Sequence, residues 1–302
     1  MRSCLAKLAT AAAFLLAAPA AWAAPEPWGI DLQPAATESA DKIHSFHELL
    51  LYIIIGVTLF VLALLIIVMV RFNRRANPVP SKTTHNTLIE VIWTIVPVMI
   101  LVVIAVPSFK LLYANEKIPS DIALTIKAIG KQWFWTYEYP DNGNFTFDAT
   151  MLADDARGDQ PRLLAVDNFM VVPEDTKVRL IVTASDVIHS WAMPAFGKKI
   201  DAVPGRLNEL WFEARDPGIY YGQCSELCGA NHAFMPIGVK VVTKEEYAAW
   251  VAQAHLRIAR GGKQVVADAH ELHRGNFLLP ARQQLVRRVQ VAGQLQRGVD
   301  AS

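Results

Sequence analysis

The chain is poor in cysteine and in charge. It has three cysteines in 302 residues, charged residues make up 19%, and the formal net charge is +1. So few cysteines exclude a disulfide-rich scaffold, and no Cys-x-x-Cys-His haem-attachment motif is present. Internal repeats are also lacking. The near-zero charge indicates no particular class of partner, and we expect no nucleic acid.

Apolar residues are abundant instead, at 53%, with a mean hydropathy of +0.25, so membrane segments are sought first. Residues 1–23 have the pattern of a secretory signal peptide: Arg2 and Lys7, then an apolar stretch, then Ala21-Trp-Ala23 as a small-x-small cleavage site. A first transmembrane helix is the alternative. Cleavage after Ala23 would remove Cys4 and leave Cys224 and Cys228 as the cysteines of the mature chain.

Two runs without charge follow, Leu49 to Val70 and Val91 to Phe109. The first would span about 33 Å as a helix, enough for the hydrocarbon core of a bilayer. A buried core helix is the less favoured alternative for each. The connecting loop carries Arg71, Arg74, Arg75 and Lys82 against Glu90, so it should stay in the cytoplasm. Everything beyond residue 112 should then lie outside the cytoplasm, as a signal peptide also requires.

Short β-branched or alternating segments then occupy residues 120–243, near 122–129, 177–183, 208–213, 218–222 and 237–242. Turn signals such as Asp141-Asn-Gly143 separate them. This pattern predicts a β-sandwich or small barrel, closed by a helix from Lys244 to Ala254. Residues 257–302 carry eight Arg or Lys against three Asp or Glu without a sustained period, which predicts a basic, disordered tail.

Soft metal ligands cluster near the end of the β-rich region. Cys224, Cys228, His232 and Met235 fall within twelve residues, and His189 lies in a polar stretch just after an expected strand. Thiolate, thioether and imidazole together favour copper, with the Glu226 carbonyl as a possible sixth donor. A Cys224–Cys228 disulfide and a Cys₂His₂ zinc site remain open alternatives, although both leave Met235 without a role.

Several separated motifs resemble subunit II of A-type cytochrome c oxidases, in that family's order. Gly222-Gln-Cys-Ser-Glu-Leu-Cys-Gly-Ala-Asn-His-Ala-Phe-Met-Pro236 is similar to its copper A signature, and Lys131-Gln-Trp-Phe-Trp-Thr-Tyr-Glu-Tyr139 to its aromatic region. Asp186-Val-Ile-His-Ser-Trp191, Asp201-Ala-Val-Pro-Gly-Arg206 and Glu90-Val-Ile-Trp-Thr-Ile-Val-Pro97 also match. The resemblance covers about residues 40–250. It implies a two-helix transmembrane hairpin followed by an all-β cupredoxin-like Greek-key barrel or sandwich.

The resemblance also implies a function. A dinuclear copper A centre would accept electrons from cytochrome c and pass them to haem in subunit I, where oxygen is reduced and protons are pumped. Its ligands would be His189, Cys224, the Glu226 carbonyl, Cys228, His232 and Met235. Three alternatives are less favoured. A quinol-oxidase subunit usually lacks these ligands, and nitrous oxide reductase needs a propeller domain for which this chain has no room. A simple copper carrier would need no acidic docking face, no surface tryptophan and no Glu90.

Further roles follow from the same resemblance. The Glu226 carboxylate would share a magnesium ion with subunit I, Trp133 would be the exposed residue where electrons enter, and Glu90 would stand at the mouth of a proton pathway. Each residue also has a simpler interpretation. Glu226 could be a solvated loop acid, Trp133 an aromatic packed on a strand face, and Glu90 an acid at a helix start. Lys131 stands where the family usually has histidine.

The expected partners are subunits I and III, membrane lipids and a cytochrome c docking on an acidic face. Residues 133–186 contain ten acidic against four basic residues, a surface that would steer a positively charged protein. The candidates are Glu138, Asp141, Asp167 and Asp186. We expect a bacterial inner-membrane protein with its N-terminus and copper domain in the periplasm, divided into residues 1–23, 24–112, 113–256 and 257–302.

Overall fold

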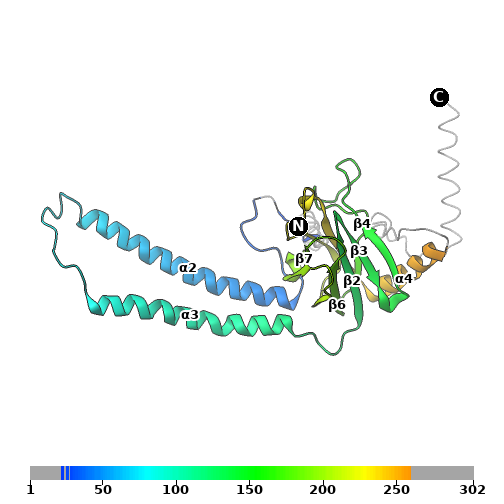
Figure 1. Cartoon of the computed structure of the whole chain (residues 1–302), viewed down its shortest axis with the longest axis horizontal. Coiled ribbons are helices and arrows are strands. Elements are labelled where there is room, and N and C mark those ends of the chain that lie inside the picture. Colours follow the sequence, from blue (N-terminus) through cyan, green and yellow to red (C-terminus); the bar gives the residue numbers. More distant parts are fainter. Residues whose placement is uncertain (1–21, 24, 27, 260–302) are drawn as a thin grey trace, which may run out of the picture. The chain divides into compact units, whose positions relative to one another are not determined.

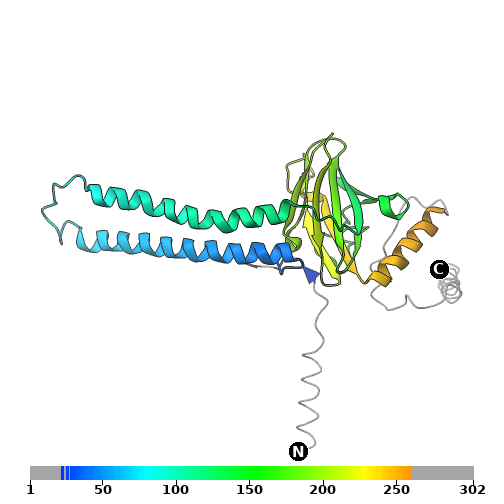
Figure 2. The ribbon, with the colours of Figure 1, turned by 90° about the horizontal axis from the view of Figure 1, so that it is seen from below.

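The computed structural model describes residues 22–23, 25–26 and 28–259, so the signal-peptide prediction lies almost entirely outside the described residues. Two long helices come first, α2 (Glu38–Arg71) and α3 (Thr87–Glu116), and they run side by side (Figure 1, Figure 2). Both contain the predicted charge-free runs and extend beyond them at each end. In the most apolar window of each helix no residue is buried, which is expected of segments that lipid or other subunits cover.

The helix ends have side-chain caps. Thr37 caps α2 by accepting a hydrogen bond from the Ala40 N–H, and the Asn86 side chain caps α3 by accepting from Ile89 N–H. Pro97 and Pro107 lie inside α3 without ending it. Lipid offers no water to unpaired backbone groups, so a continuous helix is the expected form for both apolar runs.

The β domain consists of two main sheets and a separate hairpin. One sheet has the order β4-β3-β2-β6-β9 and the other β1-β10-β11-β5. The first contains β2 (Leu124–Lys131), β3 (Phe134–Tyr139), β4 (Phe145–Ala149), β6 (Lys177–Ala184) and β9 (Asn208–Glu213). The second contains β1 (Trp22–Ala23), β5 (Met170–Pro173), β10 (Gly218–Gln223) and β11 (Pro236–Val242), while β7 (His189–Met193) pairs with β8 (Lys198–Ala202).

Alternation of side chains explains the first sheet. Residues of β2 and β6 are buried at every second position, which is the period of a strand with one face on the core. The two strands pair in parallel, whereas β3 and β4 follow as antiparallel neighbours. Trp135, Tyr137 and Tyr139 of β3 lie on one face and are fully buried, so these aromatics form part of the core.

The five expected strands are confirmed as β2, β6, β9, β10 and β11. The sequence suggested β3 only as the alternative interpretation of the aromatic region, and it did not predict β1, β4, β5, β7 or β8. Every residue of β5 and β7 is buried, so neither strand shows the alternation that identifies a strand in sequence. His189, expected in a loop after a strand, instead opens β7. β7 pairs with β8 across a short turn, and because both faces of β7 are buried its sequence lacks the alternation of a half-exposed strand.

The helix α4 (Lys244–Ala259) closes the domain as predicted and continues past the expected end at residue 254. Thr243 and Glu246 form a capping box, with mutual side-chain to backbone hydrogen bonds of 3.2 and 3.1 Å. Trp250 is buried against Tyr139 and Phe145 of the first sheet. The predicted basic tail lies, from residue 260 on, outside the described residues.

The start of α2 contacts the turn between β7 and β8. The Ala36 N–H donates to the Ala195 carbonyl at 2.8 Å, and the Thr37 hydroxyl donates to the Phe196 carbonyl at 2.8 Å. Gly197 has a φ of +62°, and a Cβ at this position would lie 2.7 Å from Ile43 Cδ1. Glycine therefore serves both the left-handed turn and the close approach of the helix. These contacts tie the strand that begins with His189 to the membrane hairpin.

Candidate metal centre

The soft ligands are gathered at one end of the β domain by β7 and by the loop between β10 and β11. The loop starts after Gln223 and ends before Pro236, and these two residues are register partners in the antiparallel pair β10–β11. Pairing of the two strands fixes both ends of the loop, so Cys224 and Met235 are held next to each other, with Cys224 N–H donating to the Met235 carbonyl at 3.4 Å. His189 reaches the loop from the start of β7.

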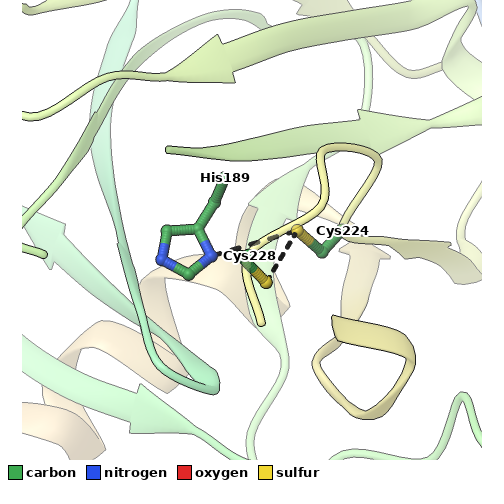
Figure 3. A group of neighbouring side chains, drawn as sticks. All are labelled: His189, Cys224 and Cys228. Atoms are coloured by element: carbon green, nitrogen blue, oxygen red, sulfur yellow. Dashed lines mark hydrogen bonds between the residues drawn. The ribbon is translucent and has the colours of Figure 1, made fainter. Parts of the chain in front are cut away.

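Three of the predicted ligands form a compact buried cluster (Figure 3). The sulfur atoms of Cys224 and Cys228 lie 3.9 Å apart, and His189 Nδ1 lies 4.0 Å from Cys224 Sγ. All three side chains are less than 5% exposed. Two thiols and an imidazole this close together are a ligand set that suits a soft metal.

The other predicted donors lie around the same two sulfurs. His232 Nδ1 is 3.6 Å and Met235 Sδ 3.5 Å from Cys228 Sγ. The Glu226 carbonyl oxygen lies 3.4 Å from Cys224 Sγ. The fold therefore brings together all six donor groups that the sequence proposed, from two segments about 35 residues apart.

These distances favour the copper site among the alternatives that spacing left open. A disulfide has an S–S bond of about 2.05 Å, far shorter than 3.9 Å, and both cysteines are free. Structural zinc takes four ligands, whereas six donors, including a thioether, converge here. A metal–sulfur bond is about 2.3 Å long, so one ion could bind both sulfurs at this separation. A second ion could bind the same two sulfurs from the opposite side. The residues thus fit a copper site with shared thiolates.

The two thiols differ in acidity. Burial alone raises the pKa of the Cys224 thiol, but hydrogen bonding, above all with His189, outweighs burial and lowers it to about 6. Burial and the neighbouring Cys224 raise the pKa of the Cys228 thiol. Cys224 is therefore the more acidic of the two thiols, and a bound soft cation would favour the thiolate form of both.

Asp186 orients His189, a role that the sequence analysis did not assign to it. Its Oδ1 accepts a hydrogen bond from His189 Nε2 at 2.8 Å, which leaves Nδ1 facing the cysteines. Burial opposes the charge of Asp186, but its hydrogen bonds with His189 and two backbone N–H groups lower the pKa of the carboxyl. An acid three residues before a ligand histidine is the signal that could have predicted this contact.

Gly130 of β2 is a second residue that the sequence did not indicate. A Cβ there would lie 2.8 Å from His189 Cδ2 and 3.0 Å from Cβ and Cγ of the same ring. Trp135, across the sheet from Gly130, contacts His189 edge to face at a centroid distance of 6.1 Å. The His189 imidazole therefore occupies the space that a side chain at position 130 would fill, and it packs against the Trp135 ring. A glycine inside a strand pattern often marks such a close approach.

Trp133 lies in the turn between β2 and β3, beside the cysteine loop. It is half-buried, and its indole N–H donates to the Cys228 carbonyl at 3.3 Å. Lys131, the residue that departs from the family pattern, places its ammonium 5.2 Å over the Phe134 ring and contacts no metal donor in the described residues. The Glu226 side chain is exposed, although its carbonyl faces the cluster.

The four predicted docking acids lie at two ends of the β2–β3 hairpin. Asp186 accepts from the Gln132 N–H at 2.7 Å, beside Trp133. Asp167 accepts from the Thr150 N–H at 2.6 Å, just after the β4 residue that pairs with Trp135. Glu138 is salt-bridged to Lys127 at 3.3 Å, and Asp141 accepts from Thr125 N–H. Strand rise places Glu138 about 17 Å from Trp133, with Asp141 farther along.

Glu90 lies in the first turn of α3, where its carboxylate accepts a hydrogen bond from the Asn86 N–H at 3.3 Å. This contact satisfies one of the free amides at the helix start, and it agrees with the simpler of the two interpretations offered by the sequence. The contact also leaves the second carboxylate oxygen available.

The fold and the site together define a class: a membrane-anchored, cupredoxin-like protein with a copper-binding cluster of histidine and cysteine. Comparison with known proteins is more specific. The cytochrome c oxidase subunit II transmembrane domain matches residues 25–111, and the periplasmic domain of the same subunit matches residues 124–242. The chain therefore belongs to the cytochrome c oxidase subunit II family.

Individual relatives agree. A probable cytochrome c oxidase subunit 2 of Rickettsia bellii is 52% identical over 80% of this chain and 90% of its own length. The subunit of Zea mays is 50% identical over 76% of this chain and 90% of its own. The crystal structure of the periplasmic domain of subunit II of cytochrome oxidase from Bradyrhizobium japonicum is 59% identical, covers 47% of this chain and 99% of that domain, and has a TM-score of 0.44.

Proposed function

We propose that the cluster holds a dinuclear copper A centre, with Cys224 and Cys228 each binding both ions and with His189, His232, Met235 and the Glu226 carbonyl completing the shell. The observation that carries this proposal is the 3.9 Å separation of two free thiols with four further donors around them. Copper held by shared thiolates supplies a one-electron carrier whose charge is spread over two ions. Through it, electrons would pass from cytochrome c to haem in subunit I.

The chain's own contribution is to hold the ligand residues in place. His189 is held by Asp186 on one side and by Gly130 and Trp135 on the other. The cysteine loop is closed by the β10–β11 pairing. Because neither ligand segment is free to move, the donors should keep their positions when the charge of the site changes, which lowers the reorganisation that accompanies electron transfer.

Copper counting tests the proposal. The soluble part, residues 117–259, should bind two copper ions per chain, turn purple and show a paramagnetic spectrum with one electron shared over two copper nuclei. A single copper with an isolated four-line pattern, or zinc alone after loading with both metals, would contradict the dinuclear assignment.

Trp133 is the proposed point where electrons enter. Its ring lies at the surface end of the site, and its N–H reaches the carbonyl of a proposed bridging cysteine. Trp133→Phe should slow reduction of the centre by cytochrome c at least about tenfold, because the hydrogen-bonded contact is lost, and should leave the copper spectrum intact. Rapid mixing with reduced cytochrome c measures the rate. If the substitution altered the copper spectrum as well as the rate of reduction, the role of Trp133 would be structural.

Cytochrome c would dock around Trp133, and subunits I and III would cover the membrane hairpin together with lipid. Asp186 and Asp167 support the docking proposal by position, since both lie at the Trp133 end of the hairpin. Glu138 and Asp141 lie farther away, and Glu138 already has a cationic partner. The rate of cytochrome c oxidation should fall with ionic strength; a flat response would argue against acidic docking.

Glu226 is proposed to serve twice, through its carbonyl on copper and through its carboxylate on a magnesium ion shared with subunit I. The exposure of the side chain on the loop supports this proposal, because a second subunit can reach it. In the intact oxidase, Glu226→Gln should lower magnesium content while copper stays bound. Unchanged magnesium would remove this role.

Glu90 is proposed to stand at the mouth of a proton pathway. It lies in the first turn of α3, next to the basic loop that we place on the cytoplasmic side. Glu90→Gln keeps the hydrogen bond to Asn86 but removes the exchangeable charge. A loss of oxygen-reduction rate in that variant, without loss of copper or assembly, is the expected result, and full activity would leave the helix cap as its role.

We propose the bacterial inner membrane as the location, with the copper domain in the periplasm. The positive loop between α2 and α3 supports this orientation. Added protease should digest the β domain in spheroplasts and leave the loop intact; the reverse pattern would overturn the orientation.

A further inference from the structure

Gln132 contacts both halves of the metal centre, although neither its sequence position nor its side chain marks it as a ligand. It precedes Trp133 in the turn between β2 and β3. Its side-chain N–H donates to the Cys228 carbonyl at 2.8 Å, and its backbone N–H donates to Asp186 Oδ2 at 2.7 Å. Asp186 in turn accepts from His189. One residue thus links the cysteine loop to the histidine segment.

The Cys228 carbonyl accepts hydrogen bonds from two consecutive residues. It accepts a short bond from Gln132 Nε2 and a longer one, 3.3 Å, from Trp133 Nε1. Two donors from consecutive residues that share one acceptor restrain each other, because moving one side chain moves the backbone that carries the other. The stronger bond of Gln132 therefore limits where the Trp133 indole can lie.

Gly229 confirms how closely the turn approaches the loop. Its φ is +120°, and a Cβ there would lie 3.1 Å from Gln132 Nε2 and 3.2 Å from Trp133 Cζ2. The residue after the cysteine is therefore a glycine at a point where the amide and the indole both press against the loop backbone. Gln132 is itself exposed, so its amide reaches the Cys228 carbonyl from the surface of the domain.

We propose that Gln132 is a positioning residue for electron transfer: its side-chain amide fixes the Cys228 carbonyl against the Trp133 indole, so that an electron can cross from the ring to the cysteine that binds copper. This role rests on the proposed function of Trp133. It differs from docking, because the amide acts inside the subunit rather than on the cytochrome. It also differs from ligation, because Gln132 places no atom on the metal donors.

The test uses the intact oxidase and Gln132→Met, which keeps the length of the side chain and removes both amide hydrogen-bonding groups. Losing this hydrogen bond loosens the indole, and we expect the limiting rate of copper reduction at saturating cytochrome c to fall roughly five- to tenfold. Reduction by a small inorganic reductant, which needs no Trp133, should stay unchanged. Thr146→Ala, at an exposed position of β4, is the matched surface control.

Three results would overturn the proposal. One is an unchanged limiting rate with a higher half-saturating concentration of cytochrome c, which would make Gln132 a docking residue. Another is equal slowing with the small reductant, which would place its effect on the copper itself. The third is a Gln132→Met and Trp133→Phe double variant in which the two losses multiply, because a residue that acts through Trp133 should add nothing once Trp133 is replaced. If Trp133→Phe alone keeps full rate, the proposed role of Trp133 fails, and this outcome is separate from the other three.

Discussion

Cys224→Ser should abolish the copper A spectrum and lower the rate of cytochrome c oxidation by at least about a hundredfold. Replacing residues that merely support ligands already costs 10–100-fold in metal affinity, and Cys224 is a ligand itself. The thiol is 4% exposed and lies within 4.0 Å of Cys228, His189 and the Glu226 carbonyl. A serine hydroxyl is a hard donor that cannot bind two soft ions at once.

Copper analysis, the paramagnetic spectrum and oxidase turnover together measure this result. Ser225→Ala is the matched control, since Ser225 is the next residue in the chain and its hydroxyl donates only to the Gln223 carbonyl at 3.3 Å among the described residues. The control should keep copper and turnover. A Cys224→Ser variant that still binds two coppers with a shared electron would contradict the bridging role.

Gly130→Ala should damage the centre without touching a ligand. The new Cβ would lie 2.8 Å from His189 Cδ2, so either the ring or β2 has to shift. Overpacking of this kind typically costs about 1–3 kcal/mol, and here the group that yields is a metal ligand. We expect a lower melting temperature together with an altered copper spectrum, measured on the same preparation of the purified oxidase.

Gly56→Ala is the control for glycine replacement, because a Cβ at Gly56 meets nothing within 4 Å among the described residues. It should leave the copper spectrum unchanged. An unaltered spectrum in Gly130→Ala, with copper fully loaded, would show that the imidazole has room to move and that Gly130 does not position it.

The membrane hairpin and most of the β domain could be predicted because their signals are local. A run such as Leu49 to Val70 has to cross lipid or be buried, and the alternation in Lys177–Ala184 puts every second side chain on a core. By contrast, β7 is buried at every position and pairs with β8 across a turn, so its conformation depends on its partners. This is why His189 was expected in a loop.

The amino-acid sequence by itself determined the chemistry of this protein: which donors it offers, that two thiols four residues apart stand with an imidazole and a thioether, and that two charge-free runs joined by a basic loop precede them. These are properties of residue type and short spacing. Only the tertiary structure decided how that chemistry is arranged, with Asp186 behind His189, Gly130 beneath its ring, and Gln132 between the histidine and cysteine segments. Asp186 and His189 are three positions apart, but the contacts of Gly130 and Gln132 join residues tens of positions apart, and packing of the whole domain rather than any local pattern brings those residues together.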